Sequence, residues 1–151
     1  MAKIRTVEAE SALVDADKQV QSFRRARQSR RLELVEDYVE LIAELIANLG
    51  KARQIDIAAR LGVAQPTVAK MLKRLADEGF IVQRPYQGVL LTEAGMDLAR
   101  RSRLRHQIVE TFLCAVGISP ETARIDAEGI EHHVSAESLE AFERFVNARA
   151  K

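Results

Sequence analysis

The sequence predicts a mainly α-helical protein that contains one small β-hairpin. Two short helical patterns meet at a glycine between Ile55 and Leu75, and a hairpin pattern follows them directly. Elsewhere apolar residues recur at the 3.6-residue spacing of helices, with few glycines or prolines between them. Together these observations predict a winged helix-turn-helix domain followed by an all-helical domain.

The first long helix is predicted from Leu32 to Leu49, where Gly50 ends it. Its apolar face carries Leu34, Tyr38, Leu41, Ile42, Leu45, Ile46 and Leu49. Its acids fall on the other side, which spacing alone assigns to solvent: Glu33, Glu36, Asp37, Glu40 and Glu44. Residues 1–20 are polar and weakly patterned. Five arginines follow them, Arg24, Arg25, Arg27, Arg30 and Arg31, and such a cluster suits a solvated face or contact with phosphates.

The stretch from Ile55 to Leu75 is typical of a helix-turn-helix. Gly62 ends the first helix, because glycine accepts a left-handed conformation, and Pro66 suits the first turn of the second. An αα-hairpin in an all-α protein is the alternative. In a helix-turn-helix the second helix enters a DNA major groove. The residues predicted to contact DNA lie on this helix and on the hairpin that follows it: Gln65, Pro66, Thr67, Lys70, Lys73, Arg74, Arg84 and Tyr86.

A β-hairpin after the second helix favours the winged subtype over the αα-hairpin. We expect strands over 80–82 and 89–91, joined by a turn over 84–88. Thr92 should cap a long helix that runs to Val116. Two further helices are predicted, one capped by Ser119 that runs to about Val134, and one capped by Ser135 over 136–148.

Charge is unevenly distributed along the 151-residue chain, although its net charge is only +1. Residues 51–88 carry seven basic and three acidic side chains, whereas residues 106–146 carry two basic and eight acidic ones. Two halves of opposite charge indicate two kinds of partner, DNA and cations. The single cysteine, Cys114, excludes an intramolecular disulfide and should be a small core residue. There is no apolar signal or membrane-spanning run, so we expect a cytoplasmic protein.

The acidic half contains a pattern suited to a divalent cation. Glu128, Glu131 and His132 are spaced to share one helix face, and His106 and Glu110 form another pair on a different helix. Carboxylates and imidazoles without thiolate suit hard or borderline ions, and a rich oxygen set suits Mn(II). Local spacing alone leaves metal binding and ordinary boundary side chains equally open. No phosphate-binding loop, nucleophile elbow or HExxH motif appears, so we do not expect an enzyme.

Four separated segments carry a resemblance to a known family. They are ARQIDIAARLGVAQPTVAKMLKRL, RPYQGVLLTEAG, RHQIVETFL and DAEGIEHHVS. In order and spacing they resemble the diphtheria toxin repressor family of metal-dependent transcription regulators, and most of all its manganese-responsive members. The resemblance covers Leu32 to the C-terminus. It implies an extension over residues 1–31, a winged helix-turn-helix domain over 32–99 and a helical metal-binding and dimerisation domain over 100–151.

The resemblance also implies a ligand set and a function. By position the metal ligands are Asp37, Glu40, His106, Glu128, Glu131 and His132, with Glu110 as a neighbouring candidate. Iron-responsive members have cysteine at the position of Glu128, so a carboxylate there favours Mn(II), with one or two ions per subunit and Fe(II) or other divalent ions as weaker alternatives. We expect a homodimer that binds a palindromic operator when metal-loaded and represses manganese uptake genes.

Three alternatives remain open at this point. The metal site could be vestigial or specific for another ion, the chain could be a metal-dependent hydrolase, or it could buffer metal without binding DNA. For the regulator, we expect the metal-free acids Asp37, Glu40, Glu128 and Glu131 to repel one another and to loosen the joint between the domains. Metal would remove this repulsion and favour the DNA-binding arrangement.

Overall fold

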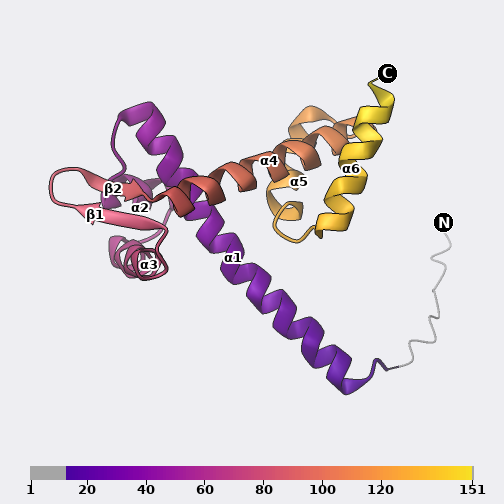
Figure 1. Cartoon of the computed structure of the whole chain (residues 1–151), viewed down its shortest axis with the longest axis horizontal. Coiled ribbons are helices and arrows are strands. Elements are labelled where there is room, and N and C mark those ends of the chain that lie inside the picture. Colours follow the sequence, from indigo (N-terminus) through magenta and orange to yellow (C-terminus); the bar gives the residue numbers. More distant parts are fainter. Residues whose placement is uncertain (1–12, 151) are drawn as a thin grey trace, which may run out of the picture.

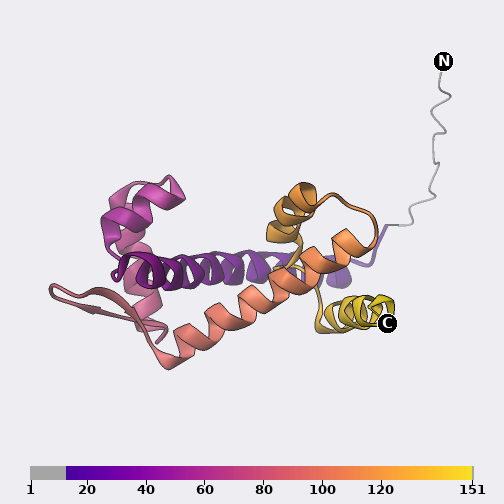
Figure 2. The ribbon, with the colours of Figure 1, turned by 90° about the horizontal axis from the view of Figure 1, so that it is seen from above.

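The computed structural model describes residues 13–150 and contains six helices and one two-stranded sheet in that range. The elements are α1 (Ala16–Leu49), α2 (Gln54–Leu61), α3 (Gln65–Asp77), β1 (Ile81–Arg84), β2 (Gly88–Leu91), α4 (Glu93–Ala115), α5 (Pro120–Ile130) and α6 (Ala136–Arg149). The predicted mainly α fold with one hairpin is confirmed. The DNA-binding lobe, α2, α3 and the hairpin, lies at one end, and the C-terminal lobe, α5 and α6 with the end of α4, at the other (Figure 1). Helix α4 runs from one lobe to the other, and α1 packs against it (Figure 2).

Helix α1 begins at Ala16, so the predicted start at Leu32 is wrong, but its end at Leu49 is confirmed. Gly50 follows with φ of 76°, a conformation that costs glycine no Cβ strain. The predicted apolar face is confirmed at Tyr38, Ile42 and Leu45, which are buried, and at Leu41 and Ile46, which pack partly buried against the core, but its edge is wrong. Leu34 and Leu49 are exposed, while the buried residues are Val35, Glu36, Tyr38, Val39, Ile42 and Leu45. Leu34 and Val35 both fit the helical period, and packing against α4 and β2 selects between them.

Helices α2 and α3 form the predicted helix-turn-helix. Gly62 adopts φ of 68° at the end of α2, which allows the chain to turn into α3. Residues from α1 to the start of α4 share one hydrophobic core with this pair, to which α2 and α3 contribute Ile57, Ala58, Val68, Met71, Leu72 and Leu75. Ile55, at the start of this stretch, is 56% exposed.

Strands β1 and β2 pair antiparallel, from Ile81 opposite Leu91 to Arg84 opposite Gly88. Strand β1 extends further toward the turn than predicted, because Arg84 ends the strand and does not lie in the loop. Tyr86 is at the tip, with φ of 64° and 96% of its surface exposed. The wing is tethered to the lobe by the Lys51 ammonium group, which donates to the Tyr86 carbonyl at 2.7 Å.

The three C-terminal helices begin where their caps were predicted. The hydroxyls of Thr92, Ser119 and Ser135 each accept a hydrogen bond from a backbone N–H three residues on. Helix α6 packs against α4 through the stacked rings of Phe112 and Phe142, whose centroids are 4.0 Å apart. Two expectations fail here. Helix α5 ends at Ile130 rather than near Val134, and Cys114 is exposed.

Among the helices of residues 13–150, none combines the length and apolar character needed to cross a bilayer.

Candidate metal centre

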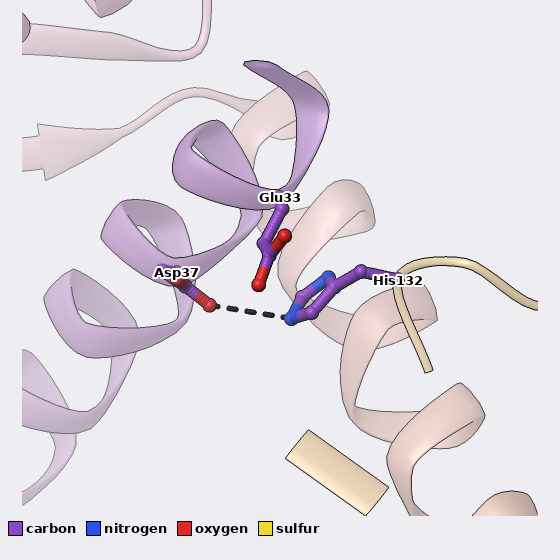
Figure 3. Close-up of side chains that lie close together, drawn as sticks. All are labelled: Glu33, Asp37 and His132. Carbon is purple, nitrogen blue, oxygen red and sulfur yellow. Dashed lines mark ion pairs between the residues drawn. The ribbon is translucent and has the colours of Figure 1, made fainter. Parts of the chain in front are cut away.

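His132 lies at the point where the C-terminal end of α5 meets α1. Its Nε2 is 3.4 Å from an Asp37 carboxylate oxygen and 3.2 Å from Glu131 Oε1. Figure 3 shows Glu33 and Asp37 projecting from α1 toward this imidazole. Glu33, Asp37 and His132 present ligand atoms within 4.8 Å of one another, so they form one group that can hold a cation.

The opposite nitrogen of His132 is held by a residue that we had assigned to solvent. Nδ1 donates to Glu36 Oε2 at 2.6 Å, and the Glu36 side chain is 3% exposed. A carboxylate on one imidazole nitrogen fixes the tautomer and the ring orientation, which leaves the other nitrogen for a metal. Glu36 is therefore a positioning residue for His132, and its predicted exposure was wrong.

A second group forms around His106 of α4. Its Nδ1 is 2.9 Å from Glu131 Oε2 and 3.8 Å from Glu128 Oε1, while its Nε2 is 3.0 Å from Glu110. His106, Glu128 and Glu131 present ligand atoms within 4.8 Å of one another. Glu110 thus contacts the second nitrogen of His106, as Glu36 contacts that of His132. Its neighbouring role at a metal site remains a prediction.

Glu131 joins the two groups, because one of its oxygens faces His132 and the other faces His106. Its Oε2 is buried and has no hydrogen-bond partner of good geometry within residues 13–150. A buried carboxylate oxygen without such a partner is costly and needs a compensating group. Carboxylates and imidazoles in this number match the ligands of hard and borderline divalent ions, so the residues fit a bound metal.

Burial and neighbouring charges together raise the pKa values of two residues of the cluster, Glu131 and His132. Burial raises the pKa of Glu131 to about 7, although the two histidines oppose this shift. Burial lowers the pKa of His132, but the carboxylates of Asp37 and Glu36, with the charge of Glu131, outweigh it and raise that pKa to about 10. His132 therefore carries a proton at neutral pH when no metal competes for it.

Glu40 is the predicted ligand that belongs to neither group. The Ser102 hydroxyl donates to Glu40 Oε1. Burial raises the pKa of Glu40, and the hydrogen bond from Ser102 acts in the opposite direction. Glu40 still belongs to the wider cluster, because the charges of Glu128 and Asp37 also raise its pKa.

Arg105 connects α1 with α5 and was not identified from the sequence. Its guanidinium donates to Glu36 Oε1 at 3.2 Å and to the Glu131 carbonyl oxygen at 2.6 Å. Together with His132, it compensates charge that we expected to be uncompensated without metal. Repulsion between acids is therefore an incomplete description of the metal-free cluster.

The predicted DNA-contacting residues lie on α3 and the wing. Gln65, Pro66, Thr67, Lys70 and Lys73 are exposed on α3, as are Arg84 and Tyr86 on the hairpin. Arg74 is half-buried, and its Nε is 2.8 Å from Glu78 of the next turn. All eight residues are thus compatible with contact to a duplex, with Arg74 already paired to a carboxylate.

Two family models together match most of the chain. Residues 32–89 match "Iron dependent repressor, N-terminal DNA binding domain" and residues 92–151 match "Iron dependent repressor, metal binding and dimerisation domain". The fold and the site therefore define a transcription regulator with a DNA-binding and a metal-binding and dimerisation domain. The chain belongs to the iron-dependent repressor family, and the resemblance inferred from its sequence is confirmed.

Two individual proteins show how close this relationship is. The chain is 59% identical over 140 residues to the transcriptional regulator MntR of Salmonella typhimurium, an alignment that covers 93% of this chain and 89% of that protein. Its fold is similar to the solved manganese regulator SloR, with 32% identity and a TM-score of 0.65 over 75% of this chain. That alignment covers 53% of SloR, so this chain spans about half of the solved structure. Its relatives are regulators, which disfavours the hydrolase alternative.

Proposed function

We propose that this protein is a Mn(II)-dependent repressor of manganese uptake genes that binds a palindromic operator as a homodimer when metal-loaded. The observation that carries this proposal is the position of the cluster on α1. That helix contributes Asp37 to the cluster and Ile42 and Leu45 to the core of the DNA-binding lobe. A change at the cluster therefore acts on the same helix that supports the recognition helix.

The proposed ligands are Asp37, Glu40, His106, Glu128, Glu131 and His132. The contacts of His132 with Asp37 and Glu131, and of His106 with Glu128 and Glu131, support five of them. Glu40 would bind a metal only after it gives up its hydrogen bond from Ser102. Glu33 is the alternative ligand from α1, because it lies in the His132 group. Two groups joined by one carboxylate support two ions per subunit. The oxygen-rich set supports Mn(II) over softer ions.

The chain's own residues describe how the signal passes. Asp37 approaches His132 from α1, while Glu131 and His132 follow the last turn of α5. A bound metal ion would supply positive charge shared by these residues. Asp37 then holds α1 against α5 more firmly than Arg105 alone, and α1 fixes the orientation of the lobe that carries α3. In a homodimer, such fixing sets two recognition helices about 34 Å apart, the spacing of one DNA turn.

The C-terminal lobe supplies a surface suited to a second subunit. Its exposed large apolar side chains are Leu104, Val116, Ile118, Ile125, Ile130 and Phe145. These side chains are available for contact with a second subunit, and residues 92–151 match a family model for a metal-binding and dimerisation domain. This supports a homodimer formed through α4, α5 and α6.

Operator binding across a series of ions tests the proposal. A duplex is first selected from a random-sequence pool by the manganese-loaded protein, and binding is then measured without metal and with Mn(II), Fe(II), Co(II), Zn(II) or Mg(II). We expect tight binding with Mn(II) and weaker binding with the others. Equal affinity with and without Mn(II) would refute metal control. Metal binding without any selected duplex would identify a metal buffer instead.

A further inference from the structure

The first half of α1, residues 16–32, projects from the molecule and is called the basic arm below. Figure 1 shows this part of the helix extending away from both lobes. Every residue of the arm is exposed except the half-buried Ser29. This part of the helix, about 25 Å long at 1.5 Å per residue, packs against nothing else within residues 13–150, so its surface there is open to a partner.

The arm is the most basic part of the described chain. It contains one acid, Asp17, against six basic residues, Lys18, Arg24, Arg25, Arg27, Arg30 and Arg31. None of these six forms an ion pair with any carboxylate of residues 13–150, although twelve such contacts occur elsewhere in that range. Unpaired basic residues along one helix are the electrostatic mark of a polyanion-binding surface.

Three of the arginines, Arg24, Arg27 and Arg31, have the i, i+3, i+7 spacing that places them on one side, and they are called the arginine stripe. Residues seven apart lie on nearly the same side of a helix, so Arg24 and Arg31 share a side of α1 with Tyr38 and Leu45. Tyr38 and Leu45 are buried in the core of the DNA-binding lobe. The stripe therefore lies on the side of α1 that carries this lobe. By the same periodicity, Glu33 and Glu40 of the metal-facing side lie about 180° away.

We propose that the arginine stripe binds the phosphate backbone of duplex DNA outside the bases read by α3. This inference rests on the proposed function, since it assumes that α3 engages DNA. Charge complementarity and the shared side of α1 favour this occupant. Contacts to phosphates hold a protein on the duplex without reading sequence, so the stripe adds affinity but not specificity.

Salt dependence of binding by the full chain tests the proposal. The stripe variant is Arg24→Gln/Arg31→Gln, and the matched control is Lys18→Gln/Arg25→Gln, which removes the same charge at the same spacing about 120° round the helix. With Mn(II) present, each is titrated at several salt concentrations with the selected operator duplex and with an unrelated duplex of equal length. Each lost phosphate contact should reduce the slope of log affinity against log salt by about 0.9.

For the stripe variant we expect the slope of log affinity against log salt to be smaller than that of the wild type, by the same amount on both duplexes. The slope of the control variant should stay close to that of the wild type. Equal slopes for the wild type and the stripe variant, or equal losses in the two variants, would overturn the proposal and leave metal control untouched. A stripe variant that becomes monomeric by light scattering would identify a second copy of the chain as the occupant and would also overturn it. If the wild type binds the operator equally with and without Mn(II), the proposed function is refuted instead. The salt slopes measured with the unrelated duplex then still test the stripe.

Discussion

The two histidines of the cluster occupy different environments. The His132 side chain is 2% exposed and is held by the buried Glu36, whereas the His106 side chain is 17% exposed and faces Glu128, which is 62% exposed. Both contact Glu131. One half of the candidate centre is therefore held in place without metal, while the other half contains an exposed carboxylate that is free to adjust.

The two halves should therefore contribute differently to metal binding. Ligands whose orientation is fixed by packing lose little entropy on binding, so the His132 half should provide most of the affinity. An exposed carboxylate adjusts to the ion that is present, so the His106 half should influence which ion is preferred. Substitutions in the two halves can test this division.

The largest effect is expected for His132→Ala. It removes the imidazole that contacts two proposed ligands, Asp37 of α1 and Glu131, which follows α5. The loss should exceed the ten- to hundredfold typical of outer partners, that is, more than about 100-fold in Mn(II) affinity. Isothermal titration of the metal and operator binding measure it together. His133→Ala is the matched control, because His133 is the next residue and its side chain is 48% exposed, near Glu33. Equal losses in both variants would contradict a fixed role for His132.

Glu36→Gln should have the next largest effect. The amide keeps the shape of the side chain and can accept from Arg105, but it no longer offers a carboxylate to His132 Nδ1. Loss of such an orienting partner typically reduces metal affinity by about 10- to 100-fold. Titration with Mn(II) checks this, with the exposed Glu44→Gln as control and thermal unfolding of both variants to detect damage to the fold. Unchanged Mn(II) affinity would show that packing alone orients His132.

The fold was predictable where local chemistry decides it. Gly62 ended α2 and Thr92 capped α4 as expected, because a left-handed glycine and an N-cap act within a few residues of the backbone. The hairpin was predictable for the same reason. On α1 the centre of the buried face was predictable but its edge was not, because Leu34 and Val35 both fit the helical period and only tertiary packing decides between them.

The candidate site was predictable only in part. The spacing of Glu128, Glu131 and His132 indicated a metal group, and the structure brings Glu131 and His132 together with Asp37. Glu36 and Arg105 were missed, because an acid at a helix position next to a buried stripe looks solvated until its partner from another helix is known. The useful signal was Glu36 itself, which borders Val35 and Val39 on the true core face.

The cluster should also respond to pH through Glu131, which the two halves share, and through His132. The raised pKa values, about 7 for Glu131 and about 10 for His132, mean that the metal-free fold binds these protons more tightly than the unfolded chain. Their contribution to the stability of the metal-free fold is complete below the unfolded values. It is then lost as pH rises through about 7 for Glu131 and about 10 for His132.

Metal must displace the same protons, so its affinity should change in the opposite direction. Below about pH 7 both groups are protonated, and each displaced proton makes affinity rise about tenfold per pH unit; above pH 7 only His132 contributes. Titrations between pH 6 and 8 in buffers of different ionisation enthalpy measure the affinity and the protons released. Glu36→Gln removes one of the carboxylates that raise the pKa of His132, so fewer protons should be released when this variant binds metal at pH 8. An affinity independent of pH would contradict protonation of His132.

The smallest change in affinity, but the clearest change in preference, is expected for Glu128→Cys. Glu128 is 62% exposed and reaches His106 at 3.8 Å, so its replacement should reduce Mn(II) affinity only a few-fold. A thiolate favours softer ions, so operator binding should respond more strongly to Fe(II), Co(II) and Zn(II). Glu128→Gln is the matched control, since it removes the charge without adding sulfur. If the glutamine variant broadens the ion response equally, loss of charge controls the preference. If neither variant alters the response, the His106 half does not select the ion, and the division between the two histidines fails.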